Sequence, residues 1–197
     1  MATRAVIAKR RRGGWIGVYH HFDGYPSGLG AHLWELLHSR YRGDMGKLVA
    51  DVIDAHPGGW SHLMEGPILK PIPGRHALSS EVTGHGPACY CHTYAEAGYG
   101  DMVIQGCECQ DPAVTDPSCD PVFIEWVYVF DTERNTLEVL TSVATPMGPD
   151  GRTHHQHWPV ATIPAHVRDV LWDQIEAAGY AIEESFWNSQ AQECASR

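Results

Sequence analysis

The stretch FIEWVYVFDTERNTLEVLTSV, residues 123–143, carries the clearest structural pattern in the chain. Residues 123–130 are rich in aromatic and β-branched side chains, which favour strands. Residues 131–135 are turn formers, and residues 136–143 return as a second run of strand formers. The stretch therefore predicts a β-hairpin in the second half of the chain.

A second hairpin is predicted at the N-terminus. Residues 3–9 and residues 15–20 both contain β-branched residues in a weakly alternating pattern. Residues 10–14, which end in two glycines, separate the two runs and predict the turn.

Helical spacing predicts three main helices. Leucines at i, i+4, i+7 and i+8 within residues 27–41 indicate a helix that begins near Gly28 or Gly30. Asp44 is suited to cap a second helix, which Pro57 and the two glycines after it should end.

The third helix is predicted to start at Pro164, because the first position of a helix needs no N–H group. Apolar residues repeat at helical spacing from Val167 to Ala178 and stop before Gly179. The tail after this glycine is expected to add one short helix.

A polar loop is predicted from Ala144 to Val160. It contains His154, His155 and His157, a spacing that can hold a metal ion. Histidines in a loop with several glycines are more often exposed to solvent, so a second ion site is the less favoured interpretation.

Together these elements predict an α+β protein with an antiparallel sheet built from the N-terminal and central hairpins, and with three main helices. A length of 197 residues fits a single domain over residues 1–197. Prolines interrupt residues 85–120, which also hold five of the six cysteines. This part is predicted to be an irregular, cysteine-rich insert held together by a metal.

The net charge of −10 is unevenly distributed. Five basic residues fall within residues 1–12, so the rest of the chain carries 9 basic against 24 acidic residues, a net charge of −15. An acidic body repels phosphate backbones, so nucleic acid is not expected as its partner. The basic run at residues 9–12 is interpreted as the solvated tip of the first hairpin.

Targeting signals are not evident. The apolar runs fall far short of the ~20 residues that span a bilayer, so no membrane association is expected. The N-terminus has positive charge without the apolar segment of a signal peptide, which predicts a cytoplasmic protein. In that compartment the six cysteines are expected to be metal ligands or core thiols rather than disulfides.

Two cysteine pairs are the best candidates for metal ligands: Cys89 with Cys91, and Cys107 with Cys109. Four thiolates can close a tetrahedron around zinc, and zinc binding would order a stretch rich in proline and glycine. Such a site would be structural, because four protein ligands leave no open position.

The spacing within each pair keeps other ligand sets open. Most structural zinc knuckles have two intervening residues, whereas only one is present here. His85, His92 or Cys119 can replace one of the sulfurs. The competing interpretation is that the cysteines are reduced and bind no metal.

The stretch VYHHFDGYPSGLGAHL, residues 18–33, is the best candidate for a functional loop. His20, His21, Asp23 and His32 are candidate catalytic residues, because a histidine near an aspartate suits the work of a general base. His20 and His21 end a strand and should point to opposite faces, so only one of them can share a site with Asp23.

The segment that follows, the DGYP turn at residues 23–26 and the glycines after it, offers candidate binding residues. These are Tyr25, Ser27 and Gly28, since glycines let the backbone approach a ligand. The same residues also suit a plain connection, in which Asp23 closes a tight turn and Ser27 prepares the next helix.

Several segments together resemble an uncharacterised protein family of actinobacteria, their plasmids and their phages. The segments are TRAVIA, GVYHHFDGYPSGLGAHLWELL, HPGGWSHL, CYCH and EWVYVFD. Shorter members share mainly the TRAxIA and YxHxDGYP parts, which implies that the cysteine region is an elaboration of a sheet-and-helix core. The resemblance implies a mobile-element or phage origin and assigns no activity.

Two functions are compatible with the sequence. The preferred one is a small cytoplasmic binding or regulatory protein with a structural zinc, which engages an unidentified protein or small-molecule partner around the DGYP turn. The alternative is a hydrolase or nuclease-like enzyme in which His20 or His21 acts with Asp23. The aromatic residues that can serve as binding anchors are Trp15, Tyr19, Tyr25 and Trp34.

Overall fold

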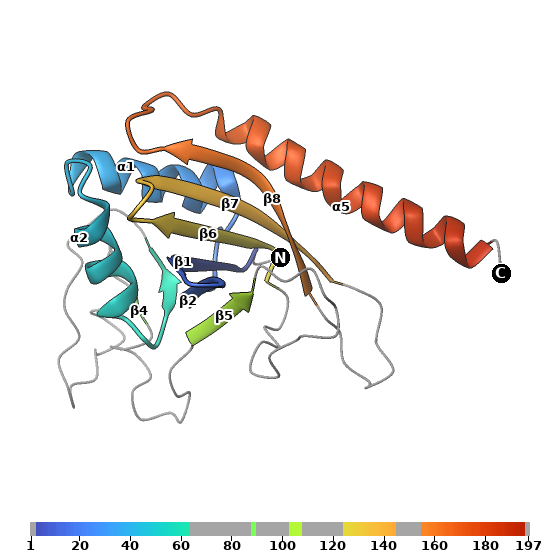
Figure 1. Cartoon of the computed structure of the whole chain (residues 1–197), viewed down its shortest axis with the longest axis horizontal. Coiled ribbons are helices and arrows are strands. Elements are labelled where there is room, and N and C mark those ends of the chain that lie inside the picture. Colours follow the sequence, from blue (N-terminus) through green and yellow to red (C-terminus); the bar gives the residue numbers. More distant parts are fainter. Residues whose placement is uncertain (1–2, 64–87, 90–102, 108–123, 145–154, 196–197) are drawn as a thin grey trace.

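The computed structural model describes residues 3–63, 88–89, 103–107, 124–144 and 155–195. Within this part, eight strands form one sheet in the order β4-β3-β2-β1-β6-β7-β8, and β5 pairs with β2 on the same side as β3. Helices pack against the sheet (Figure 1). The prediction of an α+β fold is confirmed.

The N-terminal hairpin is present as predicted. Strands β1 (Ala5–Arg11) and β2 (Gly14–His20) pair antiparallel along their whole length. The turn between them contains Gly13 at a φ of 77°, a left-handed conformation that glycine adopts without steric cost.

The central hairpin is also confirmed. It consists of β6 (Trp126–Asp131) and β7 (Thr136–Ala144), which pair antiparallel. The Asp131 carboxylate accepts hydrogen bonds from the backbone N–H groups of Glu133 and Arg134, so the first residue of the turn fixes its shape.

The predicted antiparallel sheet is wrong, because the sheet is mixed. The two hairpins join through a parallel pairing of β1 with β6, in which Ala5 lies opposite Trp126 and Lys9 lies opposite Phe130. Strand β3 (Trp60–His62) is also parallel to β2. Both β1 and β6 carry apolar side chains toward both faces, a pattern typical of strands in the interior of a parallel arrangement.

Two short strands extend the sheet beyond β2. Strand β4 (Ala88–Cys89) pairs antiparallel with β3, and β5 (Val103–Cys107) pairs antiparallel with β2. These segments belong to the region predicted to be irregular, and both are in the sheet.

Strand β8 (His155–Pro164) corrects two predictions. It pairs antiparallel with β7, so the second part of the predicted polar loop is a strand. Pro164 is the last residue of this strand and does not start a helix. Proline is tolerated there because β8 ends the strand order, where one side of the strand needs no N–H for pairing.

The first two predicted helices are confirmed. One π-helical turn, η1 (Pro26–Gly30), leads into α1 (Ala31–Ser39). The Asp44 carboxylate accepts a hydrogen bond from the N–H of Lys47 and caps α2 (Met45–Val49), which continues as η2 (Ala50–Asp54).

The last helix, α5 (Trp172–Ala195), runs through the glycine at which it was predicted to stop. A Cβ atom on Gly179 would lie 2.1 Å from Cη2 of Trp126, so this glycine allows a close approach of helix to sheet and does not end the helix. Figure 1 shows α5 lying along the sheet and extending past it toward the C-terminus. None of the helices in the described ranges combines the length and the apolar character that crossing a membrane requires.

Side chains of β1 and β6 alternate between two apolar clusters. Ala5 and Ile7 belong to the larger cluster, which includes residues of α1, α2 and the start of α5. Val6 and Ala8 belong to a second cluster on the opposite face. His20 pairs with Ala5, so its side chain enters the helix-covered face.

Candidate functional site

The backbone of the DGYP turn is fixed from several directions. Gly24 donates its N–H to the carbonyl of Thr3 at 2.9 Å, and its own carbonyl accepts from the Tyr128 hydroxyl at 2.8 Å. The carbonyl of Asp23 accepts from the N–H of Leu29 at 3.0 Å. The turn is therefore held by the N-terminus, by β6 and by η1.

His20 lies directly before this turn and is a buried structural residue, only 1% exposed. Its Nε2 atom accepts a hydrogen bond from the N–H of Leu63 at 3.1 Å, so the neutral ring carries its proton on Nδ1. Burial, and to a smaller degree the nearby His62, lower the pKa of His20 to about 3. A ring whose lone pair is occupied and whose pKa is this low is unsuited to general-base work near pH 7.

His21 lies on the opposite face, as predicted. Its Nδ1 atom is 2.6 Å from the Tyr19 hydroxyl, and Tyr19 belongs to the cluster on that face. Burial lowers the pKa of His21, which therefore stays neutral at neutral pH. His20 and His21 do not converge on one site.

The remaining catalytic candidates also fail to converge. The Asp23 side chain is exposed, and the residue adopts a φ of 54°, which aspartate tolerates in tight turns. His32 lies on α1, where it is half-buried and close enough to His20 to lower its pKa. Asp23 thus takes part in the turn through its backbone.

The three predicted binding residues make internal contacts. The Ser27 hydroxyl and N–H both donate to the Glu176 carboxylate of α5, at 2.7 and 3.1 Å. A Cβ atom on Gly28 would lie 2.7 Å from the Tyr25 ring, and Tyr25 packs against the larger apolar cluster. This segment holds η1 and α5 together.

Three of the four predicted aromatic anchors are buried: Trp15, Tyr19 and Trp34. An exposed aromatic residue of the region is Phe22, at 42% exposure. Its ring lies 4.3 Å from that of His21 and 6.4 Å from that of His62, measured between centroids. We call Phe22, His21, His62 and Asp23 the turn patch.

The end of β2 holds the turn patch rigidly. The N–H of His21 donates to Trp60, and that of Phe22 donates to Ser61, at 3.0 and 3.2 Å. The patch thus joins the β2 strand end to β3, and its rings stand on paired backbone rather than on a mobile loop.

The register of the sheet separates the two described members of the predicted zinc site. Cys89 lies opposite Trp60, which lies opposite His20 at one end of β2, whereas Cys107 lies opposite Gly14 at the other end. Six residue-to-residue steps along β2, at about 3.3 Å each, separate these ends and place the two cysteine backbones about 20 Å apart. Ligands of one zinc ion lie within about 5 Å of each other, a much shorter distance than the one between these two backbone positions.

The other predicted ligands lie outside the described residues: Cys91, Cys109, His85, His92 and Cys119. Cys89 is buried in the larger apolar cluster. Among the described residues, no group of three potential ligands is placed to hold a metal ion.

The histidines of the predicted loop have different surroundings. His154 lies outside the described residues, and the backbone of His155 is in β8. His157 lies opposite Ser142 in the sheet, and its ring packs edge-on against Trp15 at 5.3 Å. This histidine is part of the sheet surface.

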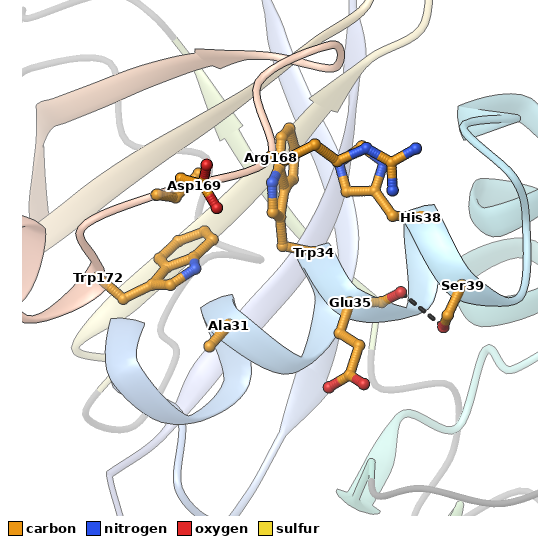
Figure 2. Close-up of a pocket in the computed structure, with 9 residues that line it drawn as sticks. Ala31, Trp34, Glu35, His38, Ser39, Arg168, Asp169 and Trp172 are labelled. Atoms are coloured by element: carbon orange, nitrogen blue, oxygen red, sulfur yellow. Dashed lines mark hydrogen bonds between the residues drawn. The ribbon is translucent and has the colours of Figure 1, made fainter.

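A groove of about 480 Å³ lies between α1 and the segment that leads into α5. Figure 2 shows Trp34 and His38 of α1 on one side and Arg168, Asp169 and Trp172 on the other. We call it the α1 groove. The N–H of the Trp34 indole donates to the carbonyl of Val167 at 3.0 Å, which fixes the two sides to each other.

Sequence reasoning missed the turn patch residues Phe22 and His62 and the whole α1 groove. Phe22 had a signal, since it is the large apolar residue directly before the DGYP turn. The α1 groove had no signal in the sequence, because Trp34 and Val167, which join its two sides, are 133 positions apart.

Comparisons with protein-family models, curated proteins and solved structures gave no match. Fold and sites together define a mixed-sheet α+β protein with a rigid surface turn and a separate aromatic groove.

Proposed function

We propose that this chain is a small cytoplasmic binding protein that docks a protein partner on the turn patch. The observation that carries the proposal is the exposed Phe22 side chain, which stands on a fixed backbone between two imidazole rings. A rigid aromatic side chain loses little conformational entropy on binding and is a frequent hot spot of interfaces.

The charge of the turn patch supports the same function. Burial and the nearby Arg4 guanidinium lower the pKa of His21, so His21 is neutral at neutral pH and the charges near it are those of Arg4 and Asp23. The partner surface that fits Phe22 is an apolar pocket. A predominantly neutral patch is also easier to desolvate than a charged one.

The test uses the full chain with a photo-crosslinking amino acid at position 22, in cells that carry the gene. A captured protein is purified, and its affinity for the unlabelled chain is measured by calorimetry. We expect Phe22→Ala to weaken binding about tenfold or more, the usual effect of removing an aromatic hot spot.

The matched control is Leu171→Ala, which removes a large apolar side chain that is 64% exposed outside the turn patch, just before α5. It should leave the affinity unchanged. Equal capture from position 171, or an unchanged affinity of the Phe22→Ala variant, would contradict docking on the turn patch.

The competing function is a hydrolase or nuclease-like enzyme that uses His21. It is supported by a neutral imidazole whose Nδ1 is oriented by the Tyr19 hydroxyl. The distribution of the candidates argues against it, since His20 is committed to Leu63 and Asp23 is exposed on its turn. We therefore rank it second.

A structural zinc ion is the other part of the proposal. Five cysteines within 31 residues of an acidic, intracellular chain are the supporting pattern. Because Cys89 and Cys107 lie at opposite ends of β2, a single ion would draw its ligands from the surroundings of one cysteine pair.

A further inference from the structure

Strand β8 forms one edge of the sheet. Among the described strands it pairs with β7 alone, and Figure 1 shows it beyond β7. An edge strand offers a row of backbone N–H and C=O groups that a strand of another molecule can bind. Pro159 and Thr162 are exposed, so the middle of this edge is open to solvent. The sequence of β8 contains no Lys, Arg, Asp or Glu, although charged side chains are a common protection of such edges.

The hydrogen bonds of β7 show which way the backbone nitrogen of Pro159 points. Ser142 donates its N–H to the carbonyl of Glu125, on the side of β6. Neighbouring residues of an antiparallel strand bond to alternate sides, so Thr141 bonds to β8. Thr141 lies opposite Trp158, whose backbone therefore faces β7. The backbone of Pro159, the next residue, faces outward.

Pro164 faces outward as well. The N–H of Ala165 donates to the carbonyl of Asn135 across the sheet, so the residue before it points away from β7. On a regular strand, Pro159 and Pro164 would face opposite sides, because an odd number of positions separates them. The register with β7 skips Val160, and this bulge changes the alternation so that both prolines lie on the outer side.

We propose that Pro159 and Pro164 make β8 a closed edge, which keeps the sheet from pairing with β8 of a second copy of this chain. Each proline lacks the N–H that a neighbouring strand needs, and its ring occupies the place where an incoming carbonyl would approach. The bulge at Val160 adds local twist, which further disfavours the pairing of two edges. The turn patch lies at the other end of the strand order, so either proposal can fail without the other.

Sedimentation velocity of the full chain over an about hundredfold range of concentration tests this proposal. Threonine restores the N–H and is a good strand former. In the double variant Pro159→Thr/Pro164→Thr, the self-association constant should rise about tenfold or more, because each new N–H adds a hydrogen bond and two paired copies gain it twice. The wild type should remain a monomer at concentrations at which the variant forms dimers or larger species.

Two further variants separate edge pairing from a general effect of replacing proline. Pro57→Thr adds the same groups in the turn after η2, outside β8, and should remain a monomer. Thr162 lies two positions before Pro164 and faces outward with it. Adding Thr162→Lys to the double variant places a charge on the edge and should restore the monomer.

Amide hydrogen exchange tests the backbone directions in the folded wild type. The outward N–H of Thr162 should exchange quickly, whereas the inward N–H groups of Trp158 and Ile163 should be protected. Circular dichroism confirms that each variant folds, and Pro164→Thr alone, at the end of β8, serves if the double variant does not fold. Three outcomes would overturn the proposal: folded edge variants that stay monomeric over the whole range, equal self-association of Pro57→Thr, or a Thr162 amide as protected as that of Ile163.

Discussion

At the scale of single residues, His20 shows how a side chain with catalytic chemistry serves the fold. Its Nε2 atom satisfies the N–H of Leu63, a donor that would otherwise be buried without a partner at the end of β3. Replacement by phenylalanine keeps a ring but removes the acceptor, which should cost about 1–3 kcal/mol of the free energy of unfolding.

The pH dependence of stability gives a sharper prediction. A histidine takes up a proton near its ordinary pKa of 6.5 in the unfolded chain, but His20 does so only near 3 in the folded protein. Between these values only the unfolded state binds the proton. The contribution of His20 is therefore complete above pH 6.5 and is lost as the pH falls toward 3, by about 1.4 kcal/mol per pH unit.

The variant His20→Gln tests the protonation of His20 separately from its hydrogen bond to Leu63. The glutamine oxygen can accept from Leu63 in place of Nε2, and it has no pKa in this range. Urea unfolding between pH 7 and pH 4 should show a stability close to wild type at pH 7 and a smaller loss on acidification. Parallel pH profiles of wild type and variant would refute the assignment.

At the scale of elements, α5 depends on one close approach. Gly179 faces Trp126 so closely that an added Cβ overlaps the indole, and Ser27 ties the same helix to η1 through Glu176. Gly179→Ala should destabilise the protein by about 1–3 kcal/mol, because either the helix or Trp126 must shift. This outweighs the helix propensity that alanine gains over glycine.

Gly46 provides the matched control, since it lies in α2, is exposed and has only the Asp44 carboxylate within 3.4 Å of an added Cβ. Gly46→Ala should raise the midpoint of urea unfolding, whereas Gly179→Ala should lower it. If both substitutions raised the midpoint, the tight contact between α5 and Trp126 would be wrong.

Elements with local signals could be predicted from sequence, and contacts between distant segments could not. Turn chemistry identified both hairpins, and Asp44 identified the start of α2. Pro164 and Gly179 carry signals with two meanings, since proline suits a strand end as well as a helix start, and glycine suits a close contact as well as a helix end. To choose between the two meanings, one must know which strand lies at the edge of the sheet and what α5 packs against.

The same distinction applies to the candidate sites. The DGYP turn could be located from its residue types, but the burial of His20 and the exposure of Phe22 depend on β3, which joins β2 from some 40 residues later. The α1 groove depends on a contact between α1 and the segment before α5. Neither arrangement leaves a periodic pattern in the chain.

At the scale of the whole molecule, the sheet decides how metal content should respond to mutation. The backbones of Cys89 and Cys107 lie at opposite ends of β2, so we predict that the two residues do not ligate the same ion. If the purified protein contains one zinc ion per chain, at most one of Cys89→Ser and Cys107→Ser should release it. Elemental analysis of both folded variants decides this, and loss of zinc in both would contradict the sheet register.

The parallel pairing of β1 with β6 has a consequence for the chain while it is being made. Ala5 finds its partner Trp126 only 121 positions later. At synthesis rates of about 5–20 residues per second, the ribosome needs roughly 6–24 s to reach that point. During this interval the apolar edge of the first hairpin has no partner strand. Such an exposed edge is recognised by chaperones and is prone to aggregation.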